Sequence, residues 1–142
     1  MQSIFSSCAI SFFVHATEDP DRIFDGLTSV LRIDRSELSL EELEGYFGNH
    51  ILSAKGLMVG KRANEIAVRI FVSMDDNSKK KFKTEIEKSI DEHDSLFLRI
   101  DRQGLRDSTL VLSDDEPIHI KLKPKNRSDR GTMLDTYREL AS

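Results

Sequence analysis

Apolar and charged or polar side chains alternate without interruption from Ile118 to Lys123, in the segment IHIKLK. Successive side chains of a β-strand point to opposite faces of a sheet, so this period of two predicts a strand with one apolar and one basic face. The apolar face must be covered by other parts of the chain, and the basic face must meet solvent or a partner. The basic face carries His119, Lys121 and Lys123.

A similar alternation of Ile10, Phe12 and Val14 with Ser11 and Phe13 predicts another strand near the start of the chain. A helix should follow, because Asp19 is a suitable N-cap, Pro20 suits the first helical position, and apolar residues then recur at helical spacing. These apolar residues are Ile23, Phe24, Leu27, Val30 and Leu31.

The middle of the chain predicts a hairpin and two helices. Extended segments at 40–46 and 50–59 flank Gly48-Asn49, which suits a tight reversal. Residues 61–74 fit both a helical stripe and a strand alternation; the length of the run and the turn that follows it favour a helix. A second helix is expected at about 78–91.

Three short strands are expected at Leu96–Asp101, Thr109–Leu112 and Pro117–Lys123, separated by turn-forming residues. The sum is an α+β domain with the order β-α-β-β-α-α-β-β-β, spanning residues 1–124. Residues 125–142 form a basic C-terminal tail, for which the sequence leaves open a short helix or a mobile segment.

Composition excludes several classes of protein. The single cysteine, Cys8, permits neither an internal disulfide nor a zinc knuckle, and no apolar run is long enough for a membrane span. The four histidines are far apart in the sequence, and no Gly-rich phosphate loop or nucleophile motif occurs. We therefore expect a cytoplasmic, non-enzymatic protein with no cofactor and no metal.

The formal net charge of -4 argues against binding nucleic acid by bulk charge, because such proteins are usually basic. The charge is unevenly distributed, however. Residues 1–60 carry nine acidic and four basic side chains, whereas residues 117–142 carry six basic and three acidic ones. Any basic surface must therefore be local.

Four segments occur in the order SFFVHATED, EGYFGNHI, LFLRIDRQ and DEPIHIKLK. Together they resemble an archaeal family of small RNA-binding proteins, often described as predicted exosome subunits, over residues 8–124. The resemblance implies a mixed sheet with helices on one face, similar to the large-subunit ribosomal protein that binds five-S rRNA. It also implies RNA and exosome-type subunits as partners.

The hairpin tip and the lysine cluster are the first two candidate sites. Glycines and aromatics at the tip either build a turn and pack on the core, or stack on unpaired bases. The lysines fall in the first turn of the expected helix, where the helix dipole disfavours cations, so they form either a tolerated solvated face or a phosphate contact. The candidates are Tyr46, Phe47, Asn49, His50, Lys79, Lys80, Lys81 and Lys83.

Two further candidate sets lie near the predicted C-terminal strands. The segment LRIDRQGLR forms either a salt-bridge network or a group that grips RNA. The basic face of the last strand, continued into the tail, is either an exposed edge protected by lysines or a row of phosphate contacts. The residues are Arg99, Arg102, Gln103, Lys121, Lys123, Lys125 and Arg127.

The leading hypothesis is therefore a non-enzymatic RNA-binding protein, accessory to RNA processing or to ribosomal RNA. The competing hypothesis is a protein-interaction adaptor or homodimeric accessory subunit of an exosome-like assembly. A contiguous positive face would favour RNA, and an apolar patch with scattered lysines would favour a protein partner.

Overall fold

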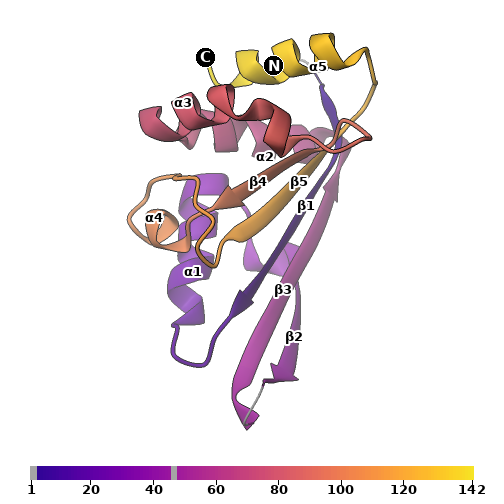
Figure 1. Ribbon diagram of the computed structural model, residues 1–142. Coiled ribbons are helices and arrows are strands. Elements are labelled where there is room, and N and C mark those ends of the chain that lie inside the picture. Colours follow the sequence, from indigo (N-terminus) through magenta and orange to yellow (C-terminus); the bar gives the residue numbers. More distant parts are fainter. Residues whose placement is uncertain (1–2, 46–47) are drawn as a thin grey trace.

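A five-stranded antiparallel sheet, with strand order β2-β3-β1-β5-β4, forms the centre of the computed structural model, which describes residues 3–45 and 48–142 (Figure 1). Every neighbouring pair of strands is antiparallel. The expectation of a mixed sheet is therefore wrong. The strands are β1 (Phe5–Val14), β2 (Ser39–Glu44), β3 (His50–Val59), β4 (Leu96–Ile100) and β5 (Ile118–Pro124).

Helices pack on one face of this sheet and across one end of it. In Figure 1, α1 and α4 lie to the left of the sheet, and α2, α3 and α5 lie across its top. The helices are α1 (Pro20–Gly26), continued by the π-helical turn η1 (Leu27–Leu31), η2 (Arg35–Glu37), α2 (Gly60–Ser73), α3 (Asp76–Thr84), η4 (Ile86–Ser89), α4 (Arg102–Arg106) and α5 (Arg130–Leu140). The expected α+β class is confirmed.

Aspartate side chains start several of these helices. The Asp19 carboxylate accepts a hydrogen bond from the Asp21 N–H, and Pro20 takes the first helical position, as the sequence predicts. Asp75, Asp101 and Asp129 cap α3, α4 and α5 in the same way. Such caps satisfy backbone donors that have no partner inside a helix.

The core lies between the sheet and the helices. Cys8, Ile10, Phe12 and Val14 of β1 are buried, whereas the side chains between them reach the opposite face of the sheet. Helix α2 faces the buried side with an apolar stripe that includes Ala63, Ile66, Ala67 and Ile70. The helical choice for residues 61–74 is therefore confirmed, and the strand alternation in that segment was a coincidence.

The predicted hairpin is confirmed as β2 and β3, with Gly48 at a φ of 74° in the reversal. The strand predicted at Thr109–Leu112 is wrong. This segment makes single bridges, from Leu110 to Met74 and from Leu112 to Ile100. Leu110 accepts a backbone hydrogen bond from Asp75 and Val111 accepts one from Asp101, so the segment is divided between two partners and forms no continuous ladder.

The C-terminal residues 130–140 form helix α5, the first of the two options that the sequence leaves open. The buried Tyr137 ring stacks on Phe5 at 5.9 Å, and its hydroxyl donates a hydrogen bond of 2.6 Å to the Asp94 carbonyl. The Asp94 carboxylate also pairs with Arg127 and Arg130. These contacts hold α5 across the end of the sheet.

Over the described parts of the chain, no helix is both long enough and apolar enough to cross a bilayer.

Candidate nucleic-acid interface

The sheet face opposite the helices carries both cations and exposed apolar side chains. Strand register places these side chains in rows that cross β3, β1, β5 and β4 in that order. One row consists of Leu57, Ala9, Lys121 and Phe97. The next row consists of Lys55, Ser11, His119 and Arg99. We call these two rows, together with Ser7, Phe13, Val59 and Lys123, the open face.

A groove of about 940 Å³ runs over the open face. Its floor comes from β3, β1, β5 and β4, and η4 with the segment after it contributes Lys88, Ile90 and Asp91. Among the described residues that line it, Asp91 is the single carboxylate, whereas the cationic side chains are Lys55, Lys88, Arg99 and Lys121, with His119 beside them. The groove therefore favours an anionic ligand.

Lys121 lies at the centre of this arrangement. Its ammonium is 5.5 Å from the centroid of the Phe97 ring, within reach of a cation–π interaction. Its charge also reaches Asp91. Burial raises the pKa of the Asp91 carboxyl, but the backbone N–H groups of Ser95 and His93, with the charges of His93 and Lys121, lower the pKa below its usual value overall. Asp91 is thus an acidic neighbour of the cations in the groove.

The apolar side chains of the open face are unusually exposed. The exposed fraction is 42% for Phe97, 50% for Phe13, 63% for Val59 and 67% for Leu57. Large apolar side chains that are exposed together on one face of a soluble protein mark an interaction surface. Apolar side chains and cations are interspersed here, a combination that suits a ligand with both flat rings and negative charge.

The basic path continues beyond the groove along β5. A smaller hollow of about 370 Å³ is lined by His93, Ser95, Lys121, Lys123, Pro124 and Arg127. Lys121 therefore belongs to both cavities. Arg127 already forms an ion pair within the protein, because its Nε atom lies 3.0 Å from the buried Asp94 carboxylate. Lys125 is exposed and follows this strand directly.

One lysine of the predicted cluster reaches this region. Lys81 lines a hollow of about 190 Å³ with Lys88 and Arg99, beside the outer edge of β4. Arg99 itself pairs with Asp114 at 3.1 Å, and both side chains are exposed. An exposed pair of this kind is weak, so Arg99 stays available to a ligand.

The lysine cluster was expected in the first turn of its helix, and this expectation is wrong for Lys81 and Lys83. Helix α3 begins at Asp76 and ends at Thr84, and Asp76 is the charged residue of its first turn. Lys81 and Lys83 lie in its last turn, where the dipole stabilises cations. Lys79 and Lys80 precede them, at the fourth and fifth helical positions. Lys81 and Lys83 therefore carry no sign of a stability cost borne for function.

Arg102 does not lie on a binding surface. Its side chain is buried, its Nη1 atom is 2.7 Å from the Glu18 carboxylate, and its Nε atom donates to the Glu116 carbonyl at 2.7 Å. Gln103, on α4, is exposed, and its side-chain amide donates to the carboxylate of Asp107, which follows the end of that helix. The sequence left two interpretations of this segment open, a salt-bridge network and a group that grips RNA. Arg102 belongs to a salt-bridge network, whereas Arg99 lies on the open face.

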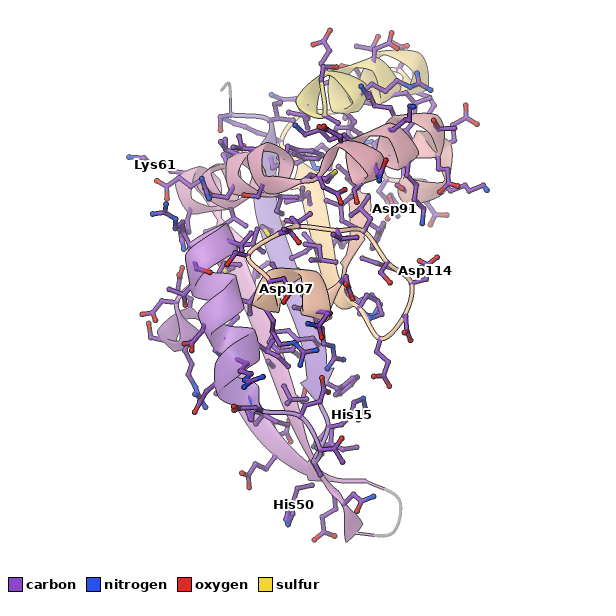
Figure 2. All side chains as sticks on the ribbon, turned by 90° about the vertical axis from the view of Figure 1, so that its left-hand side faces the viewer. His15, His50, Lys61, Asp91, Asp107 and Asp114 are labelled. Carbon is purple, nitrogen blue, oxygen red and sulfur yellow. The ribbon has the colours of Figure 1, made fainter. Side chains whose placement is uncertain are left out.

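The hairpin tip is remote from these cations. Asn49 and His50 are exposed at the end of the β2–β3 hairpin, which projects away from α3 and α5 (Figure 2). Tyr46 and Phe47 lie outside the described residues. The structure therefore does not bring Asn49 and His50 together with the basic residues of β4 and β5.

A cluster of potential metal ligands lies at the far end of β1. Atoms of His15, Glu18 and Glu116 that could hold an ion lie within 4.8 Å of one another (Figure 2 labels His15). Glu18, however, already accepts the buried Arg102 guanidinium, and His15 Nε2 lies 3.3 Å from Glu116. A fixed positive charge beside the cluster disfavours a cation, so we interpret it as a structural network.

Sequence reasoning missed Lys55, Leu57, Lys88, Phe13 and Phe97. A signal for Phe97 was present in the sequence. Phe97 and Arg99 alternate with the buried Leu96, Leu98 and Ile100 in LFLRI, just as the basic residues alternate with apolar ones in IHIKLK. Lys55 could not have been found in this way, since its place depends on β3 pairing with β1.

Comparisons with known proteins find one family model and two archaeal relatives over most of the chain. A family model described as RNA binding matches residues 7–124. RNA-binding protein PAB1135 from Pyrococcus abyssi is 27% identical over 122 residues, covering 82% of this chain and 79% of that protein. Uncharacterized protein MJ0213 from Methanocaldococcus jannaschii is 27% identical over 139 residues, covering 89% of this chain and 93% of that protein.

Solved structures share the fold. The crystal structure of protein SSO0741 from Sulfolobus solfataricus, described under the family model DUF54, superposes with a TM-score of 0.78 at 22% sequence identity. The match covers 95% of this chain and 96% of that chain. The arrangement of sheet and helices is therefore shared with that protein.

Proposed function

The chain belongs to the family described as RNA binding, and we propose that it binds RNA through the open face of its sheet. The observation that carries this proposal is the gathering of Lys55, Arg99, His119 and Lys121 around one groove, although the chain is acidic overall. Cations so placed neutralise phosphates and release counterions, which gives affinity that falls as salt rises. Phosphate contacts also orient the RNA on the protein.

The decisive variant reverses charge along β5. We expect Lys121→Glu with Lys123→Glu to weaken binding of a labelled RNA at least tenfold at low salt, measured by fluorescence anisotropy. The matched control, Arg22→Glu with Lys61→Glu, makes the same change in net charge on the exposed surface of α1 and α2. The proposal fails if both double variants lose affinity equally, since net charge alone would then explain the loss.

A protein partner is the competing function, and the exposure of Leu57 and Val59 favours it. These side chains would pack against a second copy of this chain or against another subunit. Replacing both with lysine distinguishes the two functions, because added cations should preserve or strengthen RNA binding but should disrupt an apolar protein interface. Sedimentation of both proteins reports the homodimer directly.

The role in the cell is a finer proposal, which rests on the family resemblance. We propose an accessory, non-enzymatic role in RNA processing or on ribosomal RNA, with exosome-type subunits as candidate partners. Crosslinking in cell extract tests this role. Recovery of RNA-processing subunits or rRNA by the native protein, and their loss in the β5 double variant, is the expected result; recovery of neither contradicts it.

A further inference from the structure

We propose that the open face selects unpaired RNA over double-helical RNA, with a base stacked on the Phe97 ring. This inference rests on the proposed function and names its ligand class. It starts from the exposure of an aromatic ring in a groove lined by cations. Recognition of single-stranded RNA commonly combines a basic surface with aromatic side chains on which bases stack.

The position of Phe97 suits stacking. It is the second residue of β4, between the buried Leu96 and Leu98, so its backbone is fixed by pairing with β5 while its own side chain reaches the groove. A ring mounted on a strand loses little entropy when it binds, because the element that carries it is already ordered. The ring is thus a preformed platform.

Phosphate-binding groups stand beside this platform. Arg99 follows two residues later on the same face of β4, and Lys121 is the direct cross-strand neighbour of Phe97 on β5. His119 is the corresponding neighbour of Arg99. Adjacent strands lie about 4.8 Å apart, and alternate residues along a strand about 6.6 Å apart, so one nucleotide can touch the ring and these cations together.

Lys121 can change its contact from the Phe97 ring to a phosphate when RNA binds. In the free protein its ammonium lies near the Phe97 ring, where the quadrupole of the ring attracts a cation. A stacking base takes that place, and the flexible lysine then turns toward a phosphate. Loss of the ring and loss of the charge should therefore have effects on affinity that do not add.

A double helix does not meet these features. Its bases are stacked on one another, and proteins recognise duplex RNA by its shape and its backbone. A ring in the floor of a groove cannot insert between bases that remain paired. Leu57 and Phe13, which are exposed elsewhere on the open face, would likewise gain nothing from a phosphate backbone. An unpaired strand supplies both exposed bases and phosphates.

The absence of tryptophan from the sequence allows a direct test. Phe97→Trp introduces a single fluorophore, whose emission should be quenched when a single-stranded oligouridylate is added. The control is Val72→Trp, at an exposed position on α2. Titration with a blunt RNA duplex of the same length completes the test. We expect quenching by the single strand at position 97 alone.

Three outcomes separate the inference from the proposed function. If oligouridylate binds by anisotropy but leaves the position-97 emission unchanged, stacking on this ring is wrong while RNA binding stands. If the duplex binds more tightly than the single strand, the selectivity is wrong. If neither RNA binds the native protein, the proposed function itself fails.

Conservative substitutions give the magnitude. Phe97→Leu should weaken binding of oligouridylate about tenfold, since one base loses the aromatic ring on which it stacks. Its salt dependence should stay unchanged, because no charge is removed. Phe97→Tyr keeps the ring and should retain near-native affinity. Equal affinity of the leucine and native proteins would contradict the inference.

Discussion

The guanidinium of Arg102 lies 2.7 Å from the carboxylate of Glu18, across 84 residues of sequence. The Arg102 side chain is 7% exposed and the Glu18 side chain 18% exposed. This ion pair joins α4 to the turn after β1, and it explains why an arginine that the sequence places among candidate RNA contacts is structural. Breaking a buried pair leaves an uncompensated charge.

We therefore expect Arg102→Met to lower the free energy of unfolding by about 3 kcal/mol, measured by urea denaturation. Arg22→Met is the control, because the Arg22–Asp19 pair is 3.9 Å long and exposed. Its removal should cost at most about 1 kcal/mol. At temperatures where it is folded, the Arg102 variant should keep its RNA affinity. A stability loss no larger than that of the control would refute the structural role.

Asp94 should decide whether α5 stays docked. Its buried carboxylate pairs with Arg127 at 3.0 Å and with Arg130 at 3.1 Å, while its backbone adopts a φ of 63°. Asparagine tolerates this conformation, so Asp94→Asn removes the charge with little backbone strain. We expect a loss of about 1–3 kcal/mol in the opening free energy of α5.

Hydrogen exchange measures that loss locally. Amides of residues 133–140 should exchange faster in the Asp94→Asn protein, while amides of β1 keep their protection unless global stability also falls. Asp135→Asn, which removes an exposed pair with Arg138, is the control. Unchanged exchange of α5 would show that Tyr137 packing holds the helix without the ion pairs.

Cys8 should be chemically silent in the folded protein. Its side chain is buried on the covered face of β1, and burial raises the pKa of the thiol from 9.0 to about 12, against an opposing charge on Arg62. The thiolate fraction at neutral pH is then lower by about a thousandfold. Reaction with a thiol reagent should follow unfolding as urea increases. Rapid reaction in native buffer would contradict this burial.

Acid should weaken the contact between Glu37 and Arg62. Hydrogen bonds from the Arg62 side chain lower the pKa of the Glu37 carboxyl from its usual 4.5, against the opposing effect of burial. A depressed pKa contributes stability that is present above pH 4.5 and is lost as the pH falls through the folded-state pKa.

The difference in unfolding free energy between the native protein and Glu37→Gln should therefore be largest at neutral pH. It should shrink as the pH falls below 4.5, because the native carboxyl becomes neutral as well. Urea denaturation of both proteins across this range measures the difference. If the difference in unfolding free energy does not depend on pH, the effect of the substitution comes from packing and not from the charge of Glu37.

The sequence predicts the main elements well where their patterns are local. The alternation in residues 10–14 and 118–123 identifies two strands and their faces, and Asp19 with Pro20 marks the start of α1. Helix α4 escaped prediction because it has five residues and is held by the Asp101 cap and the distant Glu18. The bridges of residues 109–112 likewise depend on partners far along the chain.

The candidate site was predicted in part for the same reason. His119, Lys121 and Lys123 share a face because of local alternation, as expected. Which side chains lie beside them depends on the strand order β2-β3-β1-β5-β4, and no local pattern specifies that order. Lys55 reaches the same row as His119 only through two successive strand pairings.

Chemical-shift mapping of the full protein with oligouridylate tests the central claim most directly. We predict that perturbed amides and side chains cluster on the open face, at Lys55, Phe97, Arg99, His119 and Lys121, and that α1, the outer surface of α2 and the hairpin tip at Asn49 stay unperturbed. Perturbations centred on the α3 lysines or on the hairpin, with the open face silent, would contradict it.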